Sequence, residues 1–135
     1  MLSEARKEIR VVTAVLESEG RYLITQRRAE ATLPLLWEFP GGRVETGESD
    51  QQAHEREVRH RLGVAIDVHE LISFIHHSYE RYSVELYLYS CRLRGLERPV
   101  NAAVHDHRWV KSDEFEKHNF TPADELSLIR LLGLE

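Results

Sequence analysis

The chain has 135 residues, of which 41% are hydrophobic and 30% charged, a balance that excludes a disordered or low-complexity protein and leaves room for one compact domain. Its 18 lysines and arginines against 23 aspartates and glutamates give a formal charge of -5, so a stable nucleic-acid partner is not expected. The single cysteine, Cys91, excludes an intrachain disulfide and a cysteine-based zinc site, and is typical of a reducing compartment.

The sequence shows no sign of export or of a membrane span. Its first ten residues are charged throughout and lack the apolar run of a secretion signal. No later segment approaches the roughly 20 apolar residues that cross a membrane. We therefore expect a cytoplasmic protein without a membrane partner, a single domain over residues 1–135, and either a monomer or a homodimer.

Strands are predicted first along the chain. Residues 9–16 are apolar on both alternating faces, which is typical of a central strand covered on both sides. A turn at residues 18–21 leads to a second strand over residues 22–26, so the two are expected to form a hairpin. A short aromatic strand begins near residue 36 and ends at Pro40, before an acidic loop with several glycines.

Helices and strands alternate in the rest of the chain. Ser49 or Asp50 is expected to cap a helix that ends near Leu62, with Gly63 as its stop. Further strands are predicted over residues 64–76, 83–94 and 108–111, with a short helix over residues 112–118. The expected class is α+β or α/β, with helices packed against a mixed sheet.

The last predicted helix begins with Thr121 as its cap and Pro122 in its first helical position. Leu126, Ile129 and Leu132 lie on one face of this helix and are expected to pack on the sheet.

The loop before the first helix contains Gly41, Gly42 and Gly47. Glycine allows backbone to turn sharply and to approach a ligand closely. A glycine loop that runs into a helix N-terminus is also a natural place for phosphate or metal. Taken alone, such a loop is more often only a turn.

One face of the first helix strengthens the case for a site. At about 100° per residue, Arg56, Glu57, His60 and Arg61 lie on one side of the helix. A charged helix face is usually solvated surface. Here, however, Glu48 stands at the helix entrance, where a bond from its carboxylate to the Arg56 guanidinium would tie the loop to the helix.

The loop and helix together resemble the Nudix box, whose pattern is G-x5-E-x7-R-E-U-x-E-E-x-G-U, with U a bulky aliphatic residue. The segments ITQRR, WEFPGG and FTPADE extend the resemblance over most of the chain and towards its MutT-like branch. The box positions that match are Gly42, Glu48, Arg56, Glu57, Val58, Gly63 and Val64.

The resemblance implies a single Nudix domain over residues 1–135, an α/β/α sandwich with a mixed β-sheet between helices. It also implies a pyrophosphohydrolase that cleaves the diphosphate bond of a nucleoside triphosphate or nucleoside diphosphate derivative, using a divalent cation that is usually magnesium. In the family the Gly42 position offers a carbonyl to metal, Glu48 and Arg56 brace the loop, and helix glutamates such as Glu57 bind metal or activate water. Clustered carboxylates suit this chemistry because they bind a hard cation that neutralises the diphosphate.

The box departs from the family at its centre, where His60 and Arg61 replace the paired glutamates. The helix face thereby loses its net negative charge, so magnesium is expected to bind weakly. A further family carboxylate, on a loop six residues before the tryptophan of a late strand, falls on Ala103 if Trp109 is that tryptophan.

Two enzymatic hypotheses remain open. In the first, the protein is a slow hydrolase that binds magnesium or manganese weakly through Glu57, Glu48, Glu45 and the substrate phosphates. In the second, His60 joins His105 or His107 in a rearranged site that prefers a transition metal such as manganese, zinc or nickel.

The third hypothesis is a catalytically silent nucleotide-binding or regulatory domain. Here Arg61 replaces the metal as the positive partner of phosphate. The remaining histidines His54, His69 and His118 are interpreted as polar surface.

The resemblance also suggests where a base would bind. It places the base against Phe39 and against Asp124, while Arg27 or Arg28 and the pair Glu80-Arg81 fall where relatives contact sugar, base or phosphate. Each has a plain alternative: Phe39 as core, the arginines as surface, and Asp124 as the third residue of a capping box. The Pro-Ala-Asp run is similar to the branch that acts on cytidine nucleotides, and the substrate stays open.

Overall fold

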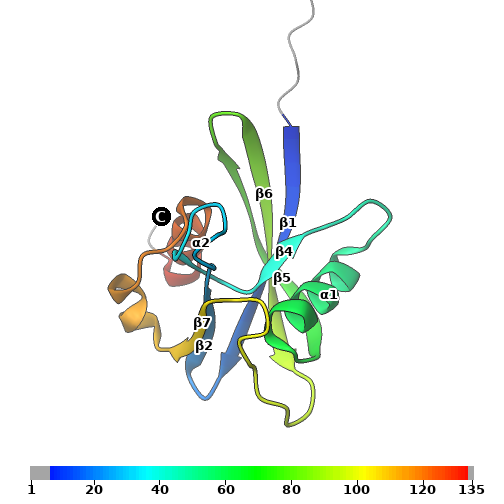
Figure 1. Ribbon diagram of the computed structural model, residues 1–135, viewed down its shortest axis with the longest axis vertical. Helices are drawn as coiled ribbons and strands as arrows, with labels where there is room; N and C mark the ends of the chain where they lie inside the picture. The colour runs from blue at the N-terminus through cyan, green and yellow to red at the C-terminus, as the bar shows by residue number, and fades with distance from the viewer. Residues whose placement is uncertain (1–6, 134–135) are drawn as a thin grey trace, which may run out of the picture.

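The computed structural model describes residues 7–133, and Figure 1 shows their arrangement. In this part of the chain seven strands form a mixed sheet in the order β3–β2–β1–β6–β5, with β4 paired to β1 and β7 paired to β2. The strands are β1 Lys7–Ser18, β2 Arg21–Gln26, β3 Trp37–Glu38, β4 Gly41–Arg43, β5 Ile66–Ser78, β6 Tyr82–Leu93 and β7 Asp106–Val110. The helices are α1 Asp50–Leu62, the 3-10 helix η1 Ser112–Lys117 and α2 Pro122–Leu132.

Helices α1 and α2 cover opposite faces of the sheet (Figure 1). Successive side chains of a strand point to opposite faces, and β1 uses both. Leu16 packs with Val58 of α1, whereas Val15 packs with Ala123 of α2. The predicted central strand and the α/β/α sandwich are therefore confirmed.

The predicted hairpin of β1 and β2 is confirmed and turns through two residues. Ser18 pairs with Arg21, and between them Glu19 and Gly20 have φ angles of 52° and 76°. Two consecutive left-handed residues are what a tight hairpin turn requires. On its other side β1 runs parallel to β6 and antiparallel to β4, so the glycines of β4 lie next to the centre of the sheet.

Helix α1 begins and ends where its sequence signals place it. The N–H of Gln52 donates to the Ser49 hydroxyl over 3.1 Å, and the Ser49 N–H donates to the Gln52 side chain over 2.9 Å. This capping box makes Ser49, rather than Asp50, the cap. At the other end Gly63 has φ 70° and donates its N–H to the Arg59 carbonyl.

The interpretation of His54 as polar surface is wrong, because this side chain is fully buried between α1 and β6. Its ring contacts the ring of Tyr89 edge-on, with centroids 5.0 Å apart. Neither ring nitrogen has a hydrogen-bond partner within residues 7–133. His69 is exposed as predicted, and His118 is half-buried with its ring against Trp37.

Helix α2 has the predicted Thr121 cap and Pro122, but the predicted face is only partly correct. Ile129 and Leu132 are 37% and 40% exposed, while Leu126 is half-buried against the sheet. The fully buried positions are Ala123, Asp124 and Ser127. Because these side chains are small or polar, α2 lies close to the segment that joins β3 and β4. A hydrogen bond between Phe39 and Asp124 holds it there.

No helix among residues 7–133 is long and apolar enough to cross a membrane. Residues 1–6, on which the expected absence of a secretion signal partly rests, lie outside the described residues.

Candidate active site

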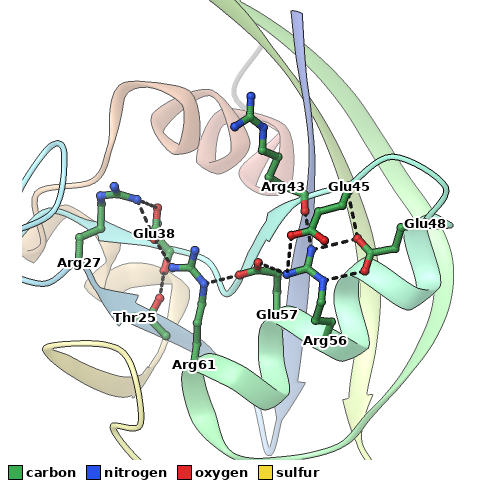
Figure 2. A network of polar contacts seen from close by, with 9 residues as sticks. All are labelled: Thr25, Arg27, Glu38, Arg43, Glu45, Glu48, Arg56, Glu57 and Arg61. Atoms are coloured by element: carbon green, nitrogen blue, oxygen red, sulfur yellow. Dashed lines mark hydrogen bonds and ion pairs between the residues drawn. The ribbon is translucent and has the colours of Figure 1, made fainter.

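A row of side chains with alternating charge runs from the β2–β3 region across α1 to the loop before it (Figure 2). Hydrogen bonds or ion pairs connect each member to the next. We call this row the charged chain, and in order it consists of Arg27, Glu38, Arg61, Glu57, Arg56 and Glu48.

The loop end of the charged chain is a brace between Glu48 and Arg56. The Arg56 Nε and Nη2 donate to the two Glu48 carboxylate oxygens over 2.7 and 2.9 Å, and Nη2 also donates to the Arg43 carbonyl over 2.8 Å. The Arg56 guanidinium, followed by the Glu45 N–H, lowers the pKa of Glu48 to about 2. Both charges persist at neutral pH, so the loop is held on α1 as the sequence predicts.

Glu57 lies at the centre of the charged chain and is held from both sides. Arg56 Nη1 donates to its Oε1 over 2.6 Å, and Arg61 Nε donates to its Oε2 over 2.8 Å. The carboxylate rests directly on the backbone of Gly42, where an added Cβ would stand 2.4 Å from Glu57 Oε2. A side chain at position 42 would therefore displace this carboxylate.

Arg61 lies between two carboxylates, Glu57 and Glu38. Its Nη1 is 3.4 Å from Glu38 Oε2, while Arg27 Nη1 approaches the two oxygens of the same carboxylate at 3.2 and 3.3 Å. A guanidinium therefore lies between these two carboxylates, and it carries one positive charge where a divalent cation would carry two.

The predicted metal ligands do not form a divalent-cation site. Both oxygens of Glu57 are bonded to arginines, and His60 is exposed. No cluster of three or more histidine, cysteine or acidic side chains suited to a metal occurs within residues 7–133. Only the Gly42 backbone and exposed surface groups remain, so the residues present do not fit a preformed site.

The alternative histidine site is not assembled either. His105 is exposed, and His107 Nδ1 lies 2.6 Å from the Asn101 side-chain oxygen. The N–H of Ala103 donates to the Arg61 carbonyl over 3.1 Å. The position of the missing family carboxylate is thus next to α1, but its methyl side chain has no metal-binding atom.

A cleft of about 280 Å³ opens beside Glu38 and Arg61 and extends to α2. Its lining combines charged and apolar side chains. Among the lining residues are Arg27, Arg43, Val84, Leu86, Tyr79 and Asp124.

Asp124 lies at the α2 end of the cleft and is 5% exposed. Its Oδ2 accepts the Phe39 backbone N–H over 3.1 Å and its Oδ1 accepts the Ser127 hydroxyl over 2.9 Å. Burial, and after it the negative charge of Glu38, raises the pKa of Asp124 to about 7. The capping-box role does not fit, because the carboxylate is bonded to Phe39 while Thr121 caps the helix.

Phe39 combines the two roles weighed for it. Its ring is 3% exposed and contacts the ring of Phe115 edge-on at 5.8 Å, so most of it is core. It also lines the cleft, and its N–H fixes Asp124.

The other predicted substrate contacts divide into those inside and those outside the cleft. Arg27 and Arg61 line it. Arg28 is paired with Glu30 over 2.8 Å at the surface. Arg81 and Glu80 are exposed at the β5–β6 turn and do not line the cleft.

Several residues that line the cleft were not predicted from the sequence, among them Glu38, Arg43, Tyr79 and Tyr82. Tyr79 and Tyr82 flank the β5–β6 turn, with stacked rings 5.0 Å apart, and a pair of tyrosines around a predicted turn was the available signal. Arg43 directly follows the glycine pair of β4. Its guanidinium has no hydrogen-bond or ion-pair partner within residues 7–133, and Figure 2 shows it pointing away from the other labelled side chains.

The fold and the braced helix have a clear match among known proteins. A family model described as NUDIX domain matches residues 11–129. The chain belongs to the Nudix family. This Nudix domain is 34% identical over 121 residues to the CTP pyrophosphohydrolase of Escherichia coli (strain K12), a match that covers 87% of each chain. It is 27% identical over 129 residues to the 8-oxo-dGTP diphosphatase of Haemophilus influenzae, covering 95% of this chain and 94% of that one.

Solved structures agree with this assignment. The solution structure of the E. coli ORF135 protein matches with a TM-score of 0.80 and 29% identity, covering 96% of this Nudix domain and 91% of that chain. The MutT protein from Methanosarcina mazei Go1 shares the fold, with a TM-score of 0.83 at 19% identity over 98% and 97% of the two chains. Nudix hydrolases generally use divalent metals such as magnesium or manganese, whereas in this Nudix domain Arg61 lies between the carboxylates.

Proposed function

We propose that this Nudix domain binds a nucleoside triphosphate in the cleft and hydrolyses its diphosphate linkage slowly, as a MutT-like pyrophosphohydrolase. The observation that carries this proposal is the polarity of the cleft. Arg27, Arg43 and Arg61 line it together with buried Asp124 and the apolar side chains of Val84 and Leu86. Such a cleft suits a ligand with a phosphate chain at one end and a planar polar base at the other.

A cytidine nucleotide is the substrate that we propose first. Asp124 has a pKa near 7 and so presents either a carboxylate, which accepts a hydrogen bond, or a carboxylic acid, which also donates one. Cytosine offers an exocyclic amine next to a ring acceptor, which complements both forms. The relative that is 34% identical is a CTP pyrophosphohydrolase, which supports the same choice.

The residues of the charged chain have distinct proposed roles. Arg61 and Arg27 neutralise the phosphates, while the Glu48–Arg56 brace positions Glu57. Glu57 is the group proposed to accept a proton from the attacking water. Both of its carboxylate oxygens are already hydrogen-bonded to arginines, so an attacking water must compete with Arg56 and Arg61 for them. This predicts slow turnover.

Divalent cations are proposed to bind weakly. A magnesium or manganese ion would compete with Arg56 and Arg61 for Glu57, and the remaining ligands would be the Gly42 carbonyl and His60. We also propose that residues 1–135 form one Nudix domain and that the protein is located in the cytoplasm. Its partner is proposed to be a small molecule rather than a nucleic acid, and the protein is proposed to be a monomer or a homodimer.

The decisive experiment measures pyrophosphate release from a panel of nucleoside triphosphates, with magnesium, manganese or neither. We expect slow release, strongest with a cytidine nucleotide, that Glu57→Gln abolishes. Arg59→Gln, on the exposed side of α1, is the matched control and is expected to leave turnover unchanged. Equal turnover in Glu57→Gln and wild type would contradict the role given to Glu57.

A catalytically silent nucleotide-binding domain is the second candidate, and the contact between Arg61 and Glu57 favours it. This contact neutralises the only box carboxylate left on that helix face. Nucleotide binding without turnover on any substrate, with any of these metals, would establish this candidate in place of the first.

A further inference from the structure

We propose that Arg27 and Arg61 form an anion site that binds a diphosphate group without a divalent cation, and that the Glu38 carboxylate is its internal occupant. The inference rests on the proposed function for the cleft in which the phosphates lie, but it does not depend on hydrolysis. It assigns Glu38 a role as a competitor that an incoming diphosphate displaces.

The first support is the way in which the two guanidiniums are anchored. Arg27 Nε donates to the Thr32 carbonyl over 2.6 Å, and Arg61 Nε donates to Glu57 over 2.8 Å. Each side chain is thus held through its Nε, with its Nη1 turned towards the Glu38 carboxylate (Figure 2). Two arginines fixed in this way are prepared for an anion, because little side-chain freedom is lost when one binds.

The second support is that the contacts between the Glu38 carboxylate and the two guanidiniums are long. Its three contacts with the outer nitrogens measure 3.2, 3.3 and 3.4 Å. Well-formed bonds between charged groups are about 2.7–2.9 Å long, as the bond from Arg61 Nε to Glu57 is at 2.8 Å. One carboxylate supplies two oxygens for two guanidiniums, whereas a diphosphate supplies more oxygens and more negative charge.

The burial and the charge of the side chains around Glu38 also favour an anion site. The side chains of Glu38, Arg27 and Arg61 are 16%, 23% and 25% exposed, so solvent screens them less than it screens surface ions. Arg61 also pairs with Glu57, so the charged chain as a whole is neutral. Arg43, whose guanidinium is unpaired within residues 7–133, lines the same cleft and adds a positive charge to it.

The test is calorimetric titration of the full-length protein with inorganic pyrophosphate in buffer containing EDTA. We expect wild type to bind, and Arg61→Gln to weaken binding about tenfold or more, because a hydrogen bond between charged groups is lost. Glu38→Gln should strengthen binding severalfold, because the competing charge is removed while the side-chain shape is kept. Arg59→Gln removes the same charge from the exposed side of α1 and should change affinity less than about twofold.

Circular dichroism checks that each variant is folded. If Arg61→Gln is unstable, Arg61→Lys takes its place and is expected to weaken binding, because lysine keeps the charge but not the guanidinium geometry. The proposal is overturned if pyrophosphate does not bind in EDTA, if Arg59→Gln and Arg61→Gln weaken it equally, or if Glu38→Gln fails to strengthen it. Binding in EDTA without hydrolysis under any condition would overturn the proposed enzyme and leave the anion site standing.

Discussion

The backbone N–H of Phe39 donates a hydrogen bond to Oδ2 of Asp124 over 3.1 Å and joins segments 85 residues apart in the sequence. Phe39 belongs to the segment between β3 and β4, and Asp124 lies in the first turn of α2. The bond therefore fixes α2 on the sheet and also sets one end of the cleft. In the proposed function, Asp124 therefore serves both the stability of the fold and the binding of the base.

Removing the Asp124 carboxylate is expected to affect both properties. Asp124→Ala leaves the buried Phe39 N–H unsatisfied, so we expect a loss of about 1–3 kcal/mol in the free energy of unfolding. Nucleotide affinity should fall about tenfold or more if the proposed base contact exists. Urea denaturation and titration with a cytidine nucleotide measure the two effects, with exposed Glu125→Ala as control. An unchanged nucleotide affinity would show that Asp124 is structural only.

The titration of Asp124 should make the free energy of unfolding depend on pH. Its pKa is raised from about 3.8 to about 7, so between these values the folded state binds more protons than the unfolded state. The contribution of Asp124 to stability is therefore present below about pH 4 and is lost as the pH rises to 7, by on the order of 4 kcal/mol at most. Asp124→Asn stays neutral, so its stability relative to wild type should rise across this range. A constant difference from pH 4 to pH 8 would refute the raised pKa.

The titration of His54 should change the free energy of unfolding with pH in the opposite direction. Burial lowers its pKa to about 4, a shift that the charge of Asp50 partly opposes. The folded state then binds fewer protons than the unfolded state between about pH 6.5 and 4, so stability falls as the pH drops through this window. His54→Leu removes the titration and two unsatisfied nitrogens, and is expected to be at least as stable as wild type at pH 7 and less sensitive to acid. Denaturation at pH 7 and pH 5 tests this, with exposed His69→Gln as control.

Restoring the family carboxylates should restore a response to magnesium. The double variant His60→Glu with Arg61→Glu places new carboxylates beside Glu57 on one helix face, where like charges repel until a divalent cation binds. We expect its melting temperature to rise by several degrees with magnesium, and its magnesium-dependent hydrolysis to exceed that of wild type. Arg59→Glu is the control for added charge. A folded double variant that ignores magnesium in both assays would show that the charge balance is not what weakens metal binding.

Gly42→Ala tests the contact beneath Glu57. An added methyl group would meet the Glu57 carboxylate at 2.4 Å, and the two arginine bonds prevent that side chain from moving freely. We expect a folded protein with at least about tenfold lower turnover, because Glu57 is displaced. Gly47→Ala, which has open space around its Cβ position but φ 82°, separates loop strain from this contact. Full activity in Gly42→Ala would remove Glu57 from the proposed mechanism.

Local signals determined most of the elements. Ser49 and Gly63 fix the ends of α1, and the alternating apolar residues of β1 require cover on both faces, so both were predictable from short stretches of sequence. The bond between Glu48 and Arg56 was likewise predictable from their spacing of two helical turns. Each of these features depends on residues close together in the chain or on a pattern with a fixed period.

Tertiary structure alone decided the aromatic partner of His54, the buried face of α2 and the contacts of Arg61. His54 lies one and two helical turns before Val58 and Leu62 on the buried face of α1, and β6 brings Tyr89 against it. Asp124 points into the protein because the fold places the Phe39 N–H next to it. Arg61 contacts Glu38 because the end of β3 lies beside α1. Such contacts join residues far apart in sequence, and their energies depend on desolvation and on partners that no local pattern contains.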